Sequence, residues 1–195
     1  LPLHAKKEKA VAATKSYLAT LHSLCQLFAN WSNNDALLDA LSILPAQMRR
    51  VQALAPKLTF DDVQGVKHCV VLGRGFGYAI AREVALKLKE VLGIQAEAFS
   101  SAEFLHGPVT LAHNRLLVLD IGINDETLES HEQQIRDVIE RGATVKSLTV
   151  DSQLHPRLHA LLVMQRFYLD IEAVAVASGF NPDEPVGLKK VTQTL

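Results

Sequence analysis

The spacing of apolar residues divides this chain near residue 67. Before that point, apolar residues recur at helical spacing over two long segments, from about Lys6 to Trp31 and from about Asp35 to Leu54, which predicts two long helices. Pro45 is expected to bend or divide the second helix. The pair could form an arm that packs on another lobe or subunit, or could cover one face of a sheet, and the pattern leaves both open.

From residue 67 onward, short apolar segments alternate with longer amphipathic ones. Strands that are apolar throughout are typical of parallel sheets buried on both faces, and strands that alternate with helices call for right-handed crossovers. The predicted fold class is α/β, a three-layer α/β/α sandwich with a parallel, flavodoxin-like sheet. The predicted elements are strand His68–Leu72, helix Tyr78–Leu92, strand Gln95–Phe99, strand Leu116–Gly122, helix Glu126–Gly142, strand Thr144–Val150 and helix Arg157–Ser178. We therefore divide the chain into a helical arm (1–60), an α/β lobe (61–178) and an irregular C-terminal tail (179–195).

Composition and charge narrow the class of partner. The chain has 195 residues, of which 48% are hydrophobic, and this suits one soluble globular domain with a substantial core. A formal net charge of −1 provides no basic field for a phosphate backbone, so we expect a small-molecule or protein partner and no nucleic acid. The most apolar segment, Leu158–Ser178, contains Arg166, Asp170 and Glu172, which predicts a core helix rather than a membrane span.

The N-terminal sequence and the two cysteines indicate the cellular compartment in which the protein is expected. The chain begins with Leu1 and has no apolar region followed by a small-residue cleavage site, so we expect no signal peptide and a cytoplasmic protein. We also expect this sequence to be the C-terminal part of a longer one. Cys25 and Cys69 lie far apart in apolar surroundings, which indicates reduced, buried thiols.

A glycine turn, Gly73-Arg74-Gly75-Phe76-Gly77, joins the first predicted strand to the next helix. Such a turn can aim backbone N–H groups at an anion. The dinucleotide fingerprint needs its third glycine where Tyr78 stands, and no clear acidic residue closes the second strand as a ribose partner. The pattern favours a tight turn over nucleotide binding.

Ionisable side chains gather after this turn. Glu83, Lys87 and Glu90 are spaced so that they share one helix face, which is typical of an exposed ladder of ion pairs. Ligands of open α/β sheets bind outside the carboxyl ends of the strands, which is the region that this helix borders. The loop that ends at His106 should bring an imidazole to the same region. Carboxylate, ammonium and imidazole together can move protons next to a carbonyl group.

Other candidates have simpler explanations. His155 and His159 have the spacing of metal ligands, but no third ligand lies near them in sequence, so we expect solvated side chains and no metal. Ser100 and Ser101 could bind a sugar hydroxyl, although helix capping is the simpler interpretation.

Five motifs, in order along nearly the whole chain, resemble the second half of SIS-domain sugar-phosphate isomerases. They are E-K-A-V-A-A-T-K-S (8–16), G-R-G (73–75), A-L-K-L-K-E (85–90), A-E-A-F-x-x-x-E-x-x-H-G-P (96–108) and N-P-D-E-P-x-x-L-x-K (181–190). The resemblance is to the isomerase lobe of glutamine-fructose-6-phosphate aminotransferase and to SIS-type glucosamine-6-phosphate deaminases. It implies a cofactor-free enzyme that acts on a hexose or hexosamine phosphate, a homodimer, and a preceding SIS lobe. Residues 1–60 would pack on that preceding lobe or on a partner's SIS lobe.

The resemblance also implies roles for individual residues. Glu90 matches the carboxylate that moves a proton between C1 and C2 of the open-chain sugar, and Lys87 matches the cation beside it. His106 matches a ring-opening histidine that reaches into the site of a neighbouring subunit. Lys190 matches the lysine of a tail that closes over the sugar and engages its carbonyl.

The remaining implied contacts to the sugar come from Val11, through its backbone, and from Ala13 and Lys189. The family often has Ser where Ala13 stands. A Ser/Thr-rich phosphate loop belongs to the first SIS lobe, and nothing in this chain replaces it. We therefore expect the chain alone to bind phosphosugar poorly.

This chain contains no glutaminase domain, so we interpret it as an aminosugar-phosphate isomerase and deaminase that forms fructose 6-phosphate and ammonia. Two alternatives stay open. One is the isomerase lobe of an aminotransferase, or another aldose-ketose isomerase. The other is a SIS domain that only senses phosphosugar.

Overall fold

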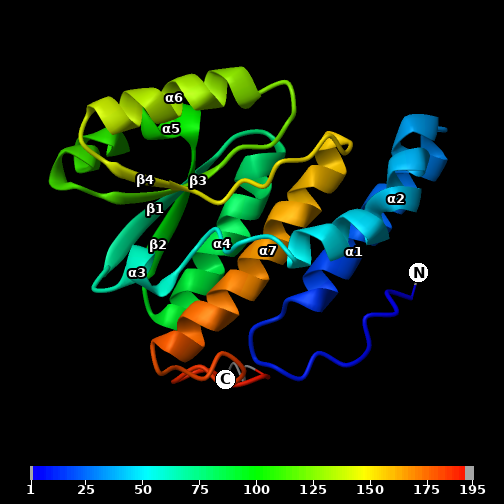
Figure 1. Cartoon of the computed structure of the whole chain (residues 1–195), viewed down its shortest axis with the longest axis horizontal. Coiled ribbons are helices and arrows are strands. Elements are labelled where there is room, and N and C mark those ends of the chain that lie inside the picture. Colours follow the sequence, from blue (N-terminus) through cyan, green and yellow to red (C-terminus); the bar gives the residue numbers. More distant parts are fainter. Residues whose placement is uncertain (1, 192–195) are drawn as a thin grey trace.

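The computed structural model describes residues 2–191, so Leu1 and the last four residues of the predicted tail lie outside the described residues. The elements form an α/β sandwich with two additional helices at one side (Figure 1). In chain order they are α1 (Lys15–Trp31), α2 (Asp35–Gln52), α3 (Phe60–Val63), β1 (His68–Gly73), α4 (Phe76–Leu92), β2 (Gln95–Ser100), α5 (Ser101–Phe104), η1 (Pro108–Asn114), β3 (Leu117–Ile121), α6 (Leu128–Glu140), β4 (Thr144–Ser147) and α7 (Pro156–Ala177).

The four strands form one parallel sheet in the order β2-β1-β3-β4. Val71 in β1 lies opposite Ala98 in β2 and Leu119 in β3. After β1 the chain goes to one side for β2 and then returns to the other side for β3, so the topological switch point lies between β1 and β3. The predicted flavodoxin-like, three-layer α/β/α fold is confirmed.

Successive side chains along β1 alternate between the two faces of the sheet, and both faces are buried. Cys69 and Val71 belong to the core under α4 and α7, while Val70 and Leu72 belong to the core under α5, η1 and α6. Figure 1 shows α4 and α7 on one side of the sheet and α5 and α6 on the other. Residues buried on both faces are the reason that these strands are apolar throughout.

Helix α7 is buried along most of its length because α4 packs on one side of it and α1 and α2 pack on another. Arg166 and Asp170 form an ion pair on α7, with 2.9 Å between Arg166 Nε and Asp170 Oδ1. The Arg166 guanidinium donates to the carbonyls of residues 51, 52 and 54, and Asp170 accepts from the N–H groups of residues 57 and 58. The pair therefore fixes the end of α2 against α7, and the predicted core helix is confirmed.

Two boundary predictions were wrong. Helix α1 begins at Lys15 rather than near Lys6, and residues 2–14 form no regular element. Pro45 does not divide α2, which continues through it to Gln52. Strand β4 ends at Ser147, earlier than predicted. The next residue, Leu148, still donates its N–H to Asp120 O of β3.

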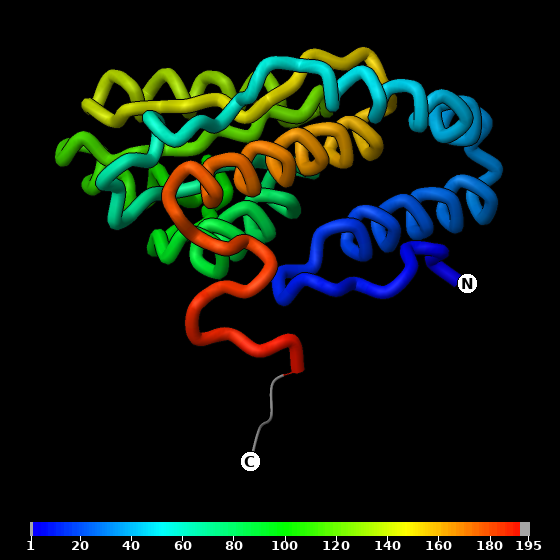
Figure 2. Tube along the Cα trace, turned by 60° about the horizontal axis from the view of Figure 1, so that its bottom comes forward, coloured from blue at the N-terminus to red at the C-terminus, as the bar shows by residue number. Residues whose placement is uncertain are grey.

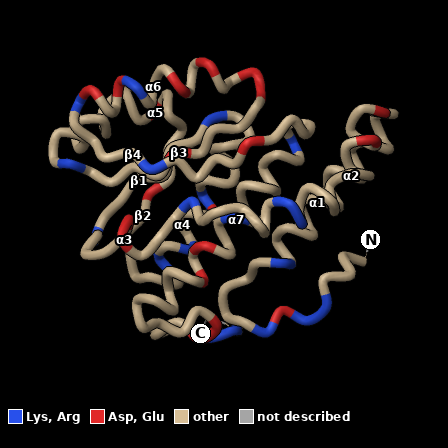
Figure 3. Tube along the Cα trace, viewed as in Figure 1, with Lys and Arg blue, Asp and Glu red and all other residues tan. Residues whose placement is uncertain are grey.

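The two N-terminal helices pack against α7 and each other rather than directly on the sheet. Outward-facing apolar side chains remain on α1, where Leu24, Leu27 and Phe28 are each about half exposed and Trp31 is 83% exposed. No helix in the described part of the chain is long and apolar enough to cross a membrane. Acidic and basic residues are interspersed over most of the fold, and α6 carries both signs (Figure 3).

Candidate functional site

A cavity of about 340 Å³ lies between the segment before α1, helices α4 and α7, and the C-terminal tail. Figure 2 shows the tail passing close to the start of α1. Most of the lining is apolar, and the polar lining groups include Lys87, Gln165 and Tyr168. An apolar cavity with a few convergent polar groups is typical of a small-molecule site.

Lys87 is the buried cation of this cavity. Its residue is 3% exposed, and its Nζ lies 2.7 Å from Glu90 Oε2 and 3.1 Å from Glu83 Oε1. The spacing alone favoured an exposed ladder of ion pairs on one face of α4, and the structure has this ladder with its lysine buried. Glu90 does not line the cavity itself; it is bound to Lys87, which does, and its side chain is 25% exposed.

The segment before α1 is shaped by Glu8. Its Oε2 accepts hydrogen bonds from the N–H of Thr14 (3.3 Å) and from the N–H and Oγ of Ser16 (3.0 and 2.6 Å). Burial disfavours the charged carboxylate, but these hydrogen bonds outweigh it and lower the pKa of Glu8. The carboxylate thus occupies the N-terminus of α1, which explains why the helix begins at Lys15.

The tail closes the side of the cavity. The N–H of Val11 donates to Asp183 O at 3.0 Å. Lys190 Nζ donates to Ala10 O at 2.5 Å and lies 3.5 Å from Val11 O. The structure therefore brings Val11 and Lys190 together from opposite ends of the chain, next to Ala10, which lines the cavity.

The other predicted site residues are placed differently. Ala13 is half-buried in the same segment as Val11, and Lys189 is exposed beside Lys190. His106 is exposed between α5 and η1, which lie across the sheet from α4. Within one chain, then, the structure does not bring His106 together with Lys87.

The glycine turn before α4 already holds a carboxylate. Asp125 Oδ2 accepts from the N–H of Phe76, the first residue of α4, at 3.2 Å. Gly75 has φ +54°, and a Cβ there would lie 2.5 Å from Asp125 Oδ2. Asp125 Oδ1 accepts from the N–H and Oγ1 of Thr127, at 2.8 and 2.6 Å. This carboxylate fills the place where an anion would bind, which agrees with the interpretation of the sequence as a tight turn.

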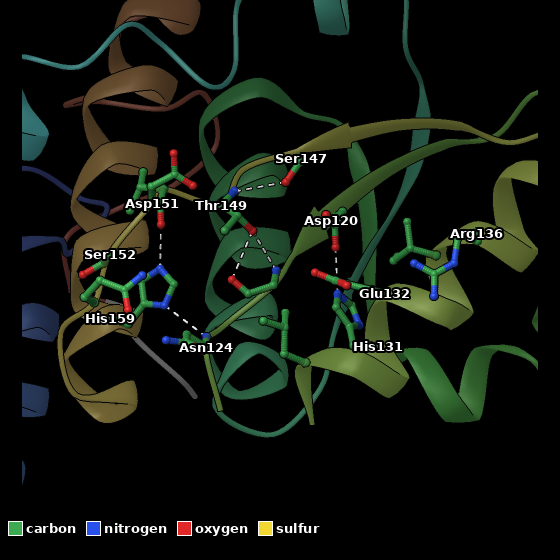
Figure 4. Close-up of a pocket in the computed structure, with 15 residues that line it drawn as sticks. Asp120, Asn124, His131, Glu132, Arg136, Ser147, Thr149, Asp151, Ser152 and His159 are labelled. Atoms are coloured by element: carbon green, nitrogen blue, oxygen red, sulfur yellow. Dashed lines mark hydrogen bonds and ion pairs between the residues drawn. The ribbon is translucent and has the colours of Figure 1, made fainter. Parts of the chain in front are cut away.

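A second, larger cavity of about 630 Å³ lies at the carboxyl ends of β3 and β4 (Figure 4). Its buried His131 lies 2.7 Å from Asp120 through Nε2 and 2.9 Å from Ser101 through Nδ1, and the Ser101 hydroxyl also contacts Gln134. Ser101 is fully buried. The sequence did not indicate this network, and the interpretation of Ser101 as a helix cap was wrong.

His159 lies at the other side of the larger cavity. Its Nδ1 accepts from Asn124 N–H at 3.1 Å and its Nε2 is 2.7 Å from Val150 O, so the ring joins the loops that follow β3 and β4. Burial lowers the pKa of His159. The prediction of a solvated His159 was wrong, while His155 accepts from Arg157 N–H at the start of α7. Within the described residues, no group of three or more His, Cys, Asp or Glu side chains could hold a metal ion.

The cysteines are free thiols and differ in burial. Cys69 is 3% exposed, as predicted, and burial raises the pKa of its thiol to about 12. Cys25 is only half-buried, so the prediction of a buried thiol was wrong there.

Residues 63–162 match the SIS domain family, and the chain belongs to that family. Among known proteins, it is 29% identical to a glutamine-fructose-6-phosphate aminotransferase from Idiomarina loihiensis over 94% of this chain and 34% of that protein. It thus spans about a third of the length of this curated relative.

Among the solved structures that resemble the chain is a protein from Silicibacter pomeroyi assigned as a phosphosugar isomerase, with a TM-score of 0.84 and 30% identity over 93% of this chain and 58% of that one. Another is a glucosamine-6-phosphate deaminase from Thermotoga maritima, with a TM-score of 0.68 and 22% identity over 94% of this chain and 58% of that one, a likeness of fold alone. The chain is thus a SIS domain that is similar to the protein from Silicibacter pomeroyi and to part of the aminotransferase.

Proposed function

We propose that this protein is an aminosugar-phosphate isomerase that converts glucosamine 6-phosphate and water to fructose 6-phosphate and ammonia. The observation that carries the proposal is the buried Lys87, which is paired with Glu90 and lines a cavity whose lining residue Ala10 accepts a hydrogen bond from Lys190. A buried ammonium beside a carboxylate suits proton transfer next to a carbonyl, because the cation stabilises the negative charge that develops on oxygen. The relative from Idiomarina loihiensis is named for a reaction of fructose 6-phosphate, and this supports the choice of a hexose or hexosamine phosphate as the substrate class.

In this mechanism Glu90 removes the proton from C2 of the open-chain aminosugar, and the electron pair forms a C1–C2 double bond. The same carboxyl group then returns the proton to C1, while a proton passes from the amine nitrogen to the C1 oxygen, which leaves a hydroxyl at C1 and an imine at C2. Water adds to the imine, ammonia departs, and the ketone of fructose 6-phosphate remains. Lys87 stabilises the enol oxygen, and Lys190 engages the sugar carbonyl.

Glu90 acts from beside the cavity, through its pairing with Lys87, and other steps need groups from farther away. His106 opens the sugar ring in the site of a neighbouring subunit, in keeping with its exposed position away from Lys87. A dimer then follows from the shared site. The phosphate binds to a preceding SIS lobe, on which residues 1–60 pack through the exposed side of α1. Ala13 and Lys189 contact the sugar beside Val11. No cofactor takes part.

The test is ammonia release from glucosamine 6-phosphate by the full-length protein. The wild type should release ammonia, and Glu90→Gln should lose most turnover, about 10²-fold or more, because the variant cannot accept the C2 proton. Glu140→Gln is the matched control, since Glu140 is an exposed carboxylate on α6. Thermal unfolding should show that both variants are folded.

Wild-type turnover in Glu90→Gln would sink the assignment of the base. If the wild type releases no ammonia, two further assays separate the alternatives. Formation of glucosamine 6-phosphate from fructose 6-phosphate and glutamine would indicate an aminotransferase. Phosphosugar binding with no turnover would indicate a sensing domain.

A further inference from the structure

Tyr168 lies on α7 opposite the ion pairs of α4. It is 8% exposed, it borders the 340 Å³ cavity, and its hydroxyl donates to Glu83 Oε1 at 2.8 Å. Burial, reinforced by the negative charge of Glu83, raises the pKa of this hydroxyl well above its ordinary value. The group is therefore a permanent hydrogen-bond donor near neutral pH and cannot serve as a base.

The oxygen that Tyr168 binds is the one that Lys87 also contacts. Lys87 Nζ lies 3.1 Å from Glu83 Oε1 and 2.7 Å from Glu90 Oε2, so the ammonium stands between two carboxylates and nearer to Glu90. A carboxylate oxygen that accepts a second hydrogen bond shares its charge between two donors and attracts each of them less. Removal of the tyrosine hydroxyl would leave Glu83 free to draw the ammonium away from Glu90.

We propose that Tyr168 is a positioning residue, which by binding Glu83 holds the Lys87 ammonium against Glu90 in the row Tyr168, Glu83, Lys87 and Glu90. The inference rests on the proposed function, because it assigns Tyr168 a part in the proton transfer between Lys87 and Glu90. It extends the site from one face of α4 to α7. Tyr168 acts through Glu83 and needs no contact with the sugar.

The first test is Tyr168→Phe in the full-length protein, with steady-state kinetics on glucosamine 6-phosphate. The phenyl ring keeps the packing, so KM should change less than about twofold, while kcat should fall about tenfold, a change that loss of one hydrogen bond to a charged group is large enough to produce. Tyr17→Phe is the matched control. Tyr17 is also partly buried near Glu83, but its hydroxyl makes no hydrogen bond to it, and kcat should not change.

A double-mutant cycle checks the route through Glu83. In a Glu83→Gln background, Tyr168→Phe should have little further effect on kcat, because the charge that Tyr168 restrains is already gone. An equal loss of kcat in both backgrounds would overturn the proposal, as would wild-type kcat in Tyr168→Phe.

A crystal structure of Tyr168→Phe gives a result that does not depend on turnover. The Lys87 ammonium should lie nearer to Glu83 than to Glu90, the reverse of the order in the wild type, and an unchanged order would overturn the proposal. If the wild type converts no phosphosugar, the proposed function fails, while these two distances still decide the placement of Lys87 by Tyr168.

Discussion

Replacement of Asp125 by Asn should weaken the start of α4 without changing the shape of the turn. In the wild type, Asp125 Oδ2 accepts from Phe76 N–H, while Oδ1 accepts from the N–H and hydroxyl of Thr127. An amide oxygen can keep the two Thr127 bonds. The amide NH₂ then faces Phe76 N–H, so one donor meets another and the helix terminus loses a negative charge.

The expected cost has two parts. Loss of a side-chain cap costs about 1 kcal/mol. Loss of a charge at the helix N-terminus costs up to about 1 kcal/mol more. The free energy of unfolding should therefore fall by about 2 kcal/mol, which lowers the melting temperature by roughly 4–8 °C for a chain of this size.

Differential scanning calorimetry measures this change, with Asp39→Asn as the control because Asp39 is exposed on α2. A second variant, Asp125→Ala, leaves the helix terminus without an anion. Inorganic phosphate should stabilise that variant more than the wild type, whose carboxylate already fills the place. The reasoning is refuted if Asp125→Asn melts within about 1 °C of the wild type, or if phosphate stabilises wild type and Asp125→Ala equally.

Three further outcomes are expected. Asp170→Ala should cost about 3–5 kcal/mol in urea unfolding, because it leaves Arg166 buried without its partner, and a loss below about 1 kcal/mol would contradict this. The pKa of His159 in the folded protein lies below its value in the unfolded chain, which is near 6.5. The contribution of His159 to stability is therefore complete above that pH and is lost as the pH falls below it. His159→Gln should thus show a smaller drop in melting temperature between pH 7.5 and 5 than the wild type, and an equal drop would contradict the assignment. With a disulfide reagent at pH 8, Cys25 should react in the folded chain while Cys69 should react only after unfolding, since burial raises its pKa to about 12; rapid reaction of both would contradict it.

The sequence predicted the sheet and its helices because each signal is local. Apolar strands and the face shared by Glu83, Lys87 and Glu90 can be identified from residues a few positions apart. Burial of Lys87 could not be predicted in this way. It depends on Tyr168 and the segment before α1, which approach α4 from distant parts of the chain.

The same limit explains what the sequence did not predict. Asp125 caps a helix whose first residue, Phe76, precedes it by 49 positions in the sequence, so no nearby pattern marks it. Glu8 caps α1 from well outside the usual capping positions, which is why the helix was predicted to begin too early. The contacts of Ser101, His131 and Asp120 join three separate elements. Asp120, near the carboxyl end of β3, was the one signal that could have drawn attention to them.

The contact of Val11 with Asp183 joins residues from near the two ends of the sequence. Contacts with such a large sequence separation close a long loop and form after local structure, so the tail should dock last during folding. Apart from the buried Pro185 and the partly buried Pro182, residues 181–191 are exposed, so they can detach by local opening while the sheet and α7 stay intact. One wall of the cavity can therefore be removed and replaced without unfolding the core, and limited proteolysis would cut this tail first.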